Sequence, residues 1–198
     1  CQIDPEMADE IMDSIGKLDT FRDVKTVEFD AAVQAGTITY ISQDVIEAFY
    51  EQVLSQSVNR GVAENSGLKL VYTPLNGTGN KPVREILRRI GVKDVAVVKE
   101  QEYPDGNFPT CPYPNPEIRQ ALEKGLALCK ELGADMLLAT DPDCDRVGIA
   151  VRDGEDYRLF TGNEVGVLLL YYIASCKKAS GTLPKDPICV KTIVTTKM

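Results

Sequence analysis

Three short β-prone runs separated by two helical segments constrain the fold of this 198-residue chain more than any other feature. The runs are residues 68–73, 95–98 and 136–140, all rich in aliphatic side chains. Apolar residues recur at helical spacing between them, and the second helical segment is predicted to open at residues 115–117 and to end at Gly133. This alternation predicts an α/β fold, a three-layer αβα sandwich with a mostly parallel sheet and right-handed crossovers.

The residues before the first run predict two helices joined by irregular chain. Asp4 followed by Pro5 is typical of an N-cap and a first helical residue. Ser42 is predicted to cap a second helix. We interpret residues 19–39 as a connector, with a short strand at residues 37–41, because hydrophobic periodicity is weak there.

The residues after the third run predict a hairpin and another helix. Residues 147–151 and 157–160 flank a polar turn and predict a β-hairpin. Thr161 and Glu164 fit a capping box, in which each side chain bonds the backbone of the other residue. A last strand is predicted at residues 188–194, as the start of a second α/β unit.

Composition and charge disfavour several classes of function. The chain has 30 Asp and Glu against 22 Lys and Arg, a formal charge of -8 that disfavours binding to nucleic acid or to anionic membranes. It has no histidine, which excludes His-based acid–base catalysis, His-ligated zinc and Ser-His-Asp triads within this chain. Its longest apolar run, residues 165–174, is far shorter than the ~20 residues of a membrane span.

The cysteines and the first residue indicate where the protein works and what it is part of. None of the six cysteines forms a Cys-x-x-Cys pair, so reduced thiols in a cytoplasmic protein are favoured over a disulfide framework. The chain starts at Cys1 rather than Met and has no signal segment. We therefore expect a fragment of a longer cytoplasmic protein.

Three aspartates at alternate positions follow the third predicted strand: Asp141, Asp143 and Asp145. In an extended backbone, alternate side chains point the same way, so these carboxylates can converge on one cation. Two like charges about 4 Å apart repel by roughly 4 kcal/mol at an effective dielectric near 20, which a bound cation would relieve. Hard oxygen ligands favour Mg²⁺, Mn²⁺ or Ca²⁺, and a site with room for water or phosphate suits Mg²⁺.

Other interpretations of this loop remain open. Aspartate and proline are also common in ordinary surface turns. An EF-hand does not fit, because Arg146 and Arg152 occupy its sixth and twelfth positions instead of Gly and Glu. A phosphatase with Asp141 as nucleophile would have Thr or Val where Asp145 stands. Arg146 itself can either contact a phosphoryl ligand or form a salt bridge with a neighbouring aspartate.

Two further loops are candidates for function. Residues 73–80 form a glycine-containing turn between a strand and a helix, which can present backbone N–H groups to an anion or be a tight turn without a ligand. The turn lacks both the dinucleotide and the P-loop fingerprints. Residues 103–109 contain a Pro-Asp-Gly turn, which is either a functional loop near a cleft or purely structural.

Taken together, these motifs resemble the α-D-phosphohexomutase family, the phosphoglucomutases and phosphomannomutases. The resemblance covers about residues 68–166 and rests on motifs in a fixed order, which are residues 73–79, 104–109 with 115–117, 140–146 and 161–166. The Asp-x-Asp-x-Asp-Arg loop is highly specific, whereas each of the other motifs alone is weak.

The resemblance implies a domain organisation and a set of roles. Family members have four domains, with a phosphoserine in the first, the metal loop in the second, a sugar-specificity loop in the third and a substrate-phosphate site in the fourth. By resemblance, residues 1–64 are the tail of domain 1 with connecting helices, residues 65–160 are the αβα metal-binding domain 2, and residues 161–198 are the truncated start of domain 3.

The same resemblance assigns the site. Asp141, Asp143 and Asp145 would hold Mg²⁺ together with the phosphate of the phosphoserine, and Arg146 would contact that phosphate. The nucleophilic serine itself is absent from this chain. Asn76 stands where many relatives have histidine, which puts any imidazole role at that position in doubt.

The expected activity belongs to the parent protein. It is the interconversion of a hexose 1-phosphate and a hexose 6-phosphate through a bisphosphorylated sugar, with glucose favoured and mannose or a pentose as alternatives. The partners are the sugar phosphate, the bisphosphate intermediate and the other domains of the same chain, and the fragment alone is expected to be inactive. Two different classes stay open: a phosphatase that uses Asp141, and a non-catalytic module that binds a cation or a sugar phosphate.

Overall fold

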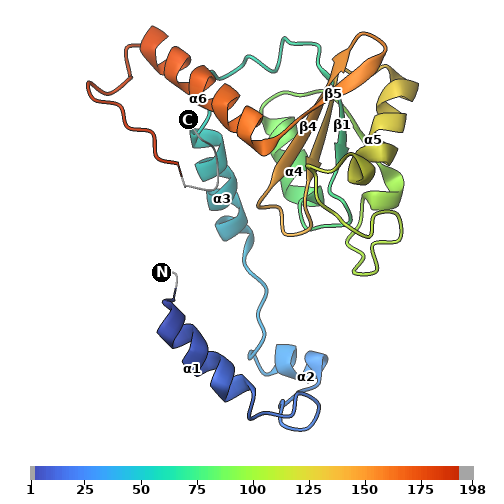
Figure 1. The fold of residues 1–198 in the computed structure, drawn as a ribbon, viewed down its shortest axis with the longest axis vertical. Coiled ribbons are helices and arrows are strands. Elements are labelled where there is room, and N and C mark those ends of the chain that lie inside the picture. The colour runs from blue at the N-terminus through green and yellow to red at the C-terminus, as the bar shows by residue number, and fades with distance from the viewer. Residues whose placement is uncertain (1–2, 192–198) are drawn as a thin grey trace. The chain divides into compact units, whose positions relative to one another are not determined.

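The computed structural model describes residues 3–191 and divides the chain into two compact units, residues 1–46 and 47–198. The first unit contains the helices α1 (Pro5–Ile15) and α2 (Phe29–Gln34) (Figure 1). Asp4 caps α1, because its Oδ1 accepts a hydrogen bond of 2.9 Å from the Met7 backbone. The predicted start of this helix is therefore confirmed.

The strand predicted at residues 37–41 is wrong. The backbone N–H groups of Thr37 and Ile38 both donate to the carbonyl of Ala32, so the chain folds back on the end of α2 instead of extending. A strand also needs a neighbour to satisfy its backbone groups, and the described part of this unit offers none. The six-residue α2 lies inside the predicted connector and is too short to show a hydrophobic period.

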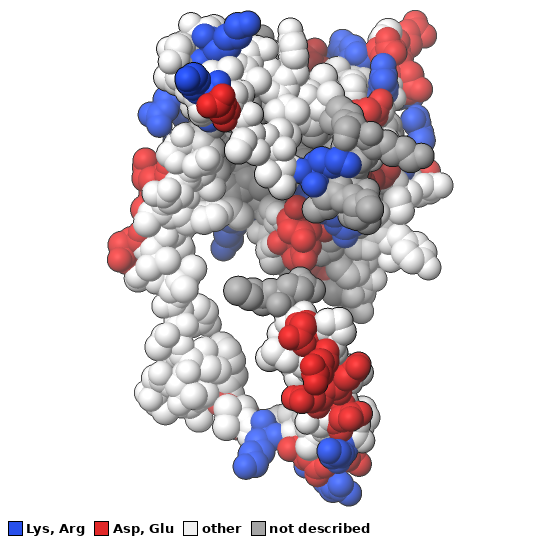
Figure 2. Space-filling model, turned by 60° about the vertical axis from the view of Figure 1, so that its left-hand side comes forward, with Lys and Arg blue, Asp and Glu red and all other residues white. Residues whose placement is uncertain are grey.

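Helix α1 carries a strongly acidic surface. Its acidic side chains gather on one side in Figure 2, and they belong to Glu6, Asp9, Glu10 and Asp13, which are all exposed. No residue of α1 is buried, although Met7, Ile11, Met12 and Ile15 recur at helical spacing. The apolar stripe seen in the sequence therefore exists on a helix but covers no core in this unit.

The second unit is built on one five-stranded sheet with the order β2-β1-β3-β4-β5. The first three strands in that order pair in parallel, whereas β3–β4 and β4–β5 pair antiparallel, so the sheet is mixed. The predicted β-hairpin is confirmed as β4 and β5. The bounds of the strands are β1 (Lys69–Thr73), β2 (Asp94–Val97), β3 (Met136–Thr140), β4 (Val147–Asp153) and β5 (Asp156–Phe160).

Helices cover both faces of this sheet, which confirms the αβα layers (Figure 1). Alternate strand residues point to opposite faces. On one face Leu137 packs in a cluster with Leu122 and Leu126 of α5, and on the other Leu70 packs with Leu87 of α4. The helices of this unit are α4 (Asn80–Arg89), the short 3₁₀ helix η1 (Lys99–Gln101), α5 (Arg119–Leu132) and α6 (Gly162–Ala179), together with residues 47–55 of α3 (Gln43–Ser55).

The predicted end of α5 and the predicted start of α6 are present, whereas the start of α5 differs. Gly133 ends α5 in the left-handed conformation with φ of 61°, and Thr161 and Glu164 form the predicted capping box of α6. Helix α5 begins at Arg119 rather than at residues 115–117. The Oδ1 of Asn115 accepts from the Glu117 backbone and holds that segment in a turn before the helix.

The predicted strand at residues 188–194 is not formed in its first part. Residues 188–191 are irregular, and residues 192–194 lie outside the described residues. None of the helices within residues 3–191 is both long and apolar enough to span a lipid bilayer.

Arg89 at the end of α4 binds residues of α3. The Nη2 of Arg89 lies 2.8 Å from Glu47, its Nε lies 2.6 Å from Glu85, and its guanidinium stacks 4.6 Å above the ring of Tyr50. The side chain of Arg89 is only 18% exposed, whereas that of Glu47 is 43% exposed, so the ion pair is partly open to water and the contact with Tyr50 is the shielded one. Residues 47–55 therefore belong to the same compact unit as the sheet.

Gly148 on β4 allows the loop before α5 to cross the sheet closely. A Cβ at this position would overlap the backbone carbonyl of Pro116. The absence of a side chain thus lets the segment that contains Pro116 lie directly against β4, next to the end of β3. This approach positions the residues that line the candidate site.

Replacing Gly148 by alanine should destabilise the chain by about 2 kcal/mol, because the backbone of Pro116 must move to admit the methyl group. Gly166→Ala is the matched control, since a Cβ there meets nothing within 4 Å and alanine favours its helix. Urea unfolding followed by circular dichroism measures both. Equal stability of the two variants would contradict the close approach.

Candidate metal site

The three aspartates lie at the carboxyl edge of the sheet, where β3 ends between β1 and β4. In open α/β sheets this edge, next to a change in strand order, is where ligands bind. One carboxylate oxygen each of Asp141, Asp143 and Asp145 lies within 4.8 Å of the others. In an octahedral Mg²⁺ site with bonds of about 2.1 Å, ligand oxygens lie ~3 to 4.2 Å apart, so the three groups suit such an ion after a small adjustment.

The aspartates converge through a turn rather than through the extended backbone that the sequence suggested. The N–H of Cys144 donates to the carbonyl of Asp141 at 3.0 Å, and Cys144 has a left-handed φ of 63°. The turn leaves Asp141 buried while Asp143 and Asp145 stay accessible to solvent. The predicted grouping of the carboxylates is thus present, but a turn at Cys144 produces it, whereas the sequence suggested an extended backbone.

Arg146 pairs with the buried aspartate. Its backbone N–H donates to Oδ1 of Asp141 at 2.9 Å, and its Nε donates to Oδ2 at 2.7 Å. The burial of Asp141 raises its pKa, but these hydrogen bonds outweigh burial and the net pKa lies below its ordinary value. The salt-bridge interpretation of Arg146 is therefore present in the structure, while 52% of its side chain stays exposed and can meet a further anion.

The accessible carboxylates repel each other. The charge of Asp143 raises the pKa of Asp145, and burial and the charge of Asp141 act in the same direction. A divalent cation would remove this repulsion, because it favours the charged form of all three groups. The arrangement is electrostatically suited to a cation and to an anionic group beside it.

The turn after β1 contacts the loop of residues 140–146, called the metal loop below, and most of its backbone N–H groups already have acceptors. The N–H of Thr78 donates to the carbonyl of Pro142 at 2.8 Å, and its hydroxyl donates to the same oxygen at 3.1 Å. The backbone N–H groups of Leu75, Asn76 and Gly77 are likewise bound to acceptors within the protein. These amides do not form an anion cradle, so the structure favours the ligand-free turn.

The loop of residues 103–109 reaches the metal loop. The side chain of Asp105 accepts hydrogen bonds from the backbone and the side chain of Asn107, which closes the turn. Phe108, the next residue, lines an open depression of about 530 Å³. The other residues that line this depression are Tyr113, Pro114, Asn115, Ile118, Asp141, Pro142, Asp143 and Arg146. The sequence did not assign Tyr113 or Ile118 to the site, because their proximity depends on how closely the chain crosses β4.

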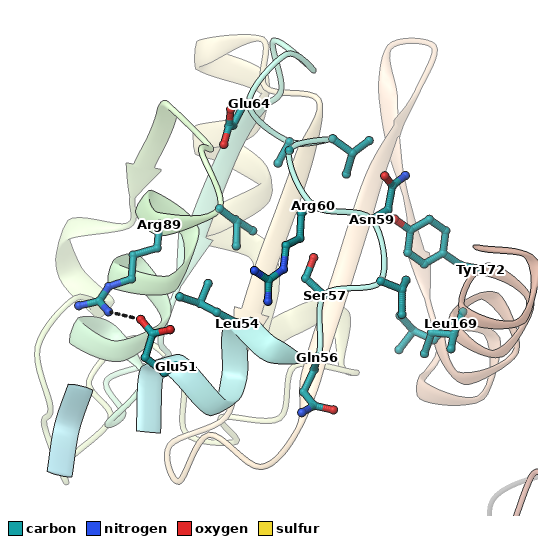
Figure 3. A pocket seen from close by; sticks show the side chains of 16 residues that line it. Glu51, Leu54, Gln56, Ser57, Asn59, Arg60, Glu64, Arg89, Leu169 and Tyr172 are labelled. Atoms are coloured by element: carbon teal, nitrogen blue, oxygen red, sulfur yellow. Dashed lines mark ion pairs between the residues drawn. The ribbon is translucent and has the colours of Figure 1, made fainter. Parts of the chain in front are cut away.

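A second hollow of about 410 Å³ lies between the end of α3, the loop of residues 56–64 and α6 (Figure 3). Leu54 comes from α3, and Leu169 and Tyr172 come from α6. Glu51 and Arg89 pair with each other there at 3.8 Å, which offsets their charges. No group of metal-ligating side chains is found here among the described residues.

One buried carboxylate, that of Glu102, pairs with two cations that are partly or largely exposed. Glu102 is 5% exposed, and it accepts hydrogen bonds from Arg84 at 2.7 Å and from Lys99 at 3.1 Å. The Lys99 ammonium lowers the pKa of Glu102, and together with Arg84 it outweighs the opposing effect of burial. This pair ties α4 to the segment that leads to Phe108.

One family matches this chain by its sequence profile. The profile described as "Phosphoglucomutase/phosphomannomutase, alpha/beta/alpha domain II" covers residues 47–154. That range includes the first four strands of the sheet, the two helices that cover it and the loop from Asp141 to Arg146.

The curated relatives are named as mutases of different sugar phosphates. A phosphoglucomutase of Staphylococcus saprophyticus is 35% identical over 85% of this chain and 30% of its own length. A phosphomannomutase of Mycoplasmoides pirum is 30% identical over 87% of this chain and 31% of its own length, and a phosphoribomutase of Saccharomyces cerevisiae is 34% identical over 87% and 30%. The chain thus spans about 30% of the length of these relatives.

Solved structures share the fold. A putative phosphomannomutase of Thermus thermophilus superposes with a TM-score of 0.54 at 26% identity, over 69% of this chain and 30% of that one. A phosphoglucomutase/phosphomannomutase family protein of Burkholderia thailandensis has a TM-score of 0.54 at 22% identity, over 66% and 26%, which is a likeness of fold alone.

Glu102→Gln should lower the free energy of unfolding by about 1 kcal/mol at pH 7, because the charged hydrogen bonds to Arg84 and Lys99 weaken, and the effect is small because Arg84 is 44% and Lys99 82% exposed. Since the folded-state pKa of Glu102 is lowered, its contribution exists above the unfolded pKa of about 4.3 and disappears as the pH falls through the folded value. Urea unfolding at pH 7 and at decreasing pH tests this, with Glu155→Gln in the exposed hairpin turn as the control. A stability difference that persists at the lowest pH would contradict the ion pair.

Proposed function

This chain belongs to the phosphoglucomutase/phosphomannomutase family, and we propose that it supplies the magnesium-binding part of a sugar-phosphate mutase. The observation that carries the proposal is the convergence of Asp141, Asp143 and Asp145 beside Arg146, within the range that matches the family. Because the chain spans about 30% of the length of its relatives, the activity is that of the longer protein. The domain boundaries at residues 64 and 160 are part of the same proposal.

The residues of this chain have distinct roles in the proposed reaction. Asp141, Asp143 and Asp145 bind Mg²⁺, which when bound supplies positive charge against the phosphoryl group in transfer. Arg146 orients Asp141 through two hydrogen bonds and directs its exposed guanidinium to a phosphate oxygen. The phosphoryl group is carried by a phosphoserine outside this chain.

The substrate is a sugar phosphate whose phosphoryl group moves between two positions through a bisphosphorylated intermediate. We favour hexose 1-phosphate and hexose 6-phosphate, with glucose as the sugar, on the likeness to the staphylococcal phosphoglucomutase. Mannose and ribose remain alternatives, because similarly close relatives carry those names. We place the enzyme in the cytoplasm, since the cysteines of the described part, among them Cys111 and Cys129, are free thiols.

A phosphatase that uses Asp141 as its nucleophile is disfavoured by the geometry. Asp141 is fully buried, and both of its oxygens accept hydrogen bonds from Arg146. An attacking carboxylate must approach the phosphorus of its substrate in line, and the burial and the two hydrogen bonds of Asp141 oppose that approach, whereas a cation needs only a remaining lone pair at the edge of the depression. A non-catalytic module that binds a cation without turnover remains an outcome of the experiment below.

Asp143→Asn in the full-length protein should lower mutase turnover by about 100-fold and weaken Mn²⁺ binding, because one of the accessible charged ligands is lost. Electron paramagnetic resonance of Mn²⁺ gives the affinity independently of activity. Asp94→Asn, an exposed carboxylate at the amino end of β2, is the matched control and should behave as the unaltered protein.

The outcomes separate the candidate functions. Loss of both Mn²⁺ affinity and turnover in Asp143→Asn, with neither lost in Asp94→Asn, supports the proposed mutase. Full turnover in Asp143→Asn would overturn the metal assignment. Mn²⁺ binding by an unaltered protein that turns over no sugar phosphate would favour the binding module.

The 198-residue chain by itself should show no mutase turnover, because the proposed phosphoserine belongs to another part of the longer protein. It should also release no inorganic phosphate from sugar phosphates, since Asp141 is buried. Retention of Mn²⁺ binding would show that the sample is folded. A phosphoryl group on this chain that hydroxylamine removes, as it does from a phosphoryl-aspartate, would contradict the proposal and revive the phosphatase.

A further inference from the structure

We infer that Asn76 is a positioning residue that holds the wall of the depression around Phe108 in place against the metal loop. Asn76 lies in the turn between β1 and α4 and is 6% exposed, and within residues 3–191 its hydrogen bonds go to residues other than the aspartates and Arg146. The inference rests on the proposed function only for its activity measurement, and its structural part stands independently.

Four hydrogen bonds join Asn76 to the segment of residues 100–105. Its Nδ2 donates to the carbonyl of Glu100 at 3.2 Å and to that of Tyr103 at 2.9 Å. Its backbone N–H donates to the carbonyl of Gln101 at 2.9 Å, and its own carbonyl accepts from the N–H of Asp105 at 3.2 Å. A single residue therefore holds four positions from the end of η1 into the loop that follows it.

The side chain of Asn76 acts through the two hydrogen bonds that its amide group donates. Both hydrogens of the amide are used, whereas Oδ1 is the one buried side-chain oxygen or nitrogen of the described residues that has no partner. Asn76 also adopts a left-handed φ of 58°, a conformation that asparagine tolerates better than most residues. An unpaired acceptor and an unusual backbone are tolerated here because the two donor contacts hold the neighbouring segment.

The held segment continues directly into the wall of the depression. Asp105, whose N–H is bound by Asn76, accepts from the N–H of Phe108 at 3.1 Å. Phe108 lines the depression together with Asp143 and Arg146. A displacement of residues 100–105 would therefore move Phe108 relative to the metal loop.

The two residues that follow Asn76 in the chain, Gly77 and Thr78, contact the metal loop. Gly77 lies so close to Pro142 that a Cβ would overlap it, and Thr78 bonds the carbonyl of Pro142 twice. Pro142 separates the two ligands Asp141 and Asp143. Asn76 thus links the two loops, with Phe108 reached through Asp105 and the carboxylates reached through Gly77 and Thr78.

The experiment compares variants of the full-length protein by hydrogen–deuterium exchange and by the Mg²⁺ dependence of turnover. Asn76→Gly removes the amide while glycine accepts the left-handed backbone. Asn76→Asp keeps the shape of the side chain but has no N–H to donate. Tyr157→Phe is the matched control, since Tyr157 is a buried residue of β5 whose hydroxyl also contacts two backbone carbonyls, those of Cys129 and Ala134, away from the metal loop.

Both Asn76 variants should raise the exchange rate of residues 103–111 at least 10-fold and raise the Mg²⁺ concentration for half-maximal turnover at least 5-fold. Tyr157→Phe should change neither. Unchanged exchange in Asn76→Gly, equal loosening in Tyr157→Phe, or normal behaviour of Asn76→Asp would each overturn the inference. Faster exchange in a protein that shows no mutase turnover even when unaltered would support the positioning role and overturn the proposed function alone.

Discussion

The close contact between Gly77 and Pro142 is the constraint on which the rest of the site depends. Two neighbouring parallel strands, β1 and β3, end side by side, and the loops that follow them must pass each other at the same edge of the sheet. Only a residue without a side chain fits against Pro142, and Thr78 then bonds its carbonyl. This contact decides how the aspartates on either side of Pro142 are presented, because their backbone cannot shift without displacing the turn after β1.

Charge is distributed unevenly within the acidic loop, and this gives its carboxylates different tasks. The buried Asp141 is neutralised by Arg146, which makes it a rigid part of the loop. Asp143 and Asp145 retain their mutual repulsion in solvent, so they are the groups that gain from a cation. A loop with three buried carboxylates would be too costly to fold, whereas three exposed ones would have no fixed geometry.

Local patterns predicted most of the fold, and long-range contacts account for what they missed. The strands, the Asp4 cap and the capping box at Thr161 depend on a few neighbouring residues, so the sequence shows them directly. The strand expected at residues 37–41 failed because a strand requires a partner that no local pattern supplies. The three aspartates were visible as a motif, but the contribution of Asn76 depends on carbonyls more than twenty residues away.

The strand order also sets the sequence of events when the chain is made. β1 lies between β2 and β3, and its residue Leu70 must wait for Met136 to be synthesised before the pairing that shapes the acidic loop can form. At a ribosomal rate of about 5–20 residues per second, the apolar β1 remains without that neighbour for several seconds. The β4–β5 hairpin, by contrast, joins residues made within a second or two of each other. The nascent protein is therefore most exposed to aggregation and to chaperones before β3 leaves the ribosome.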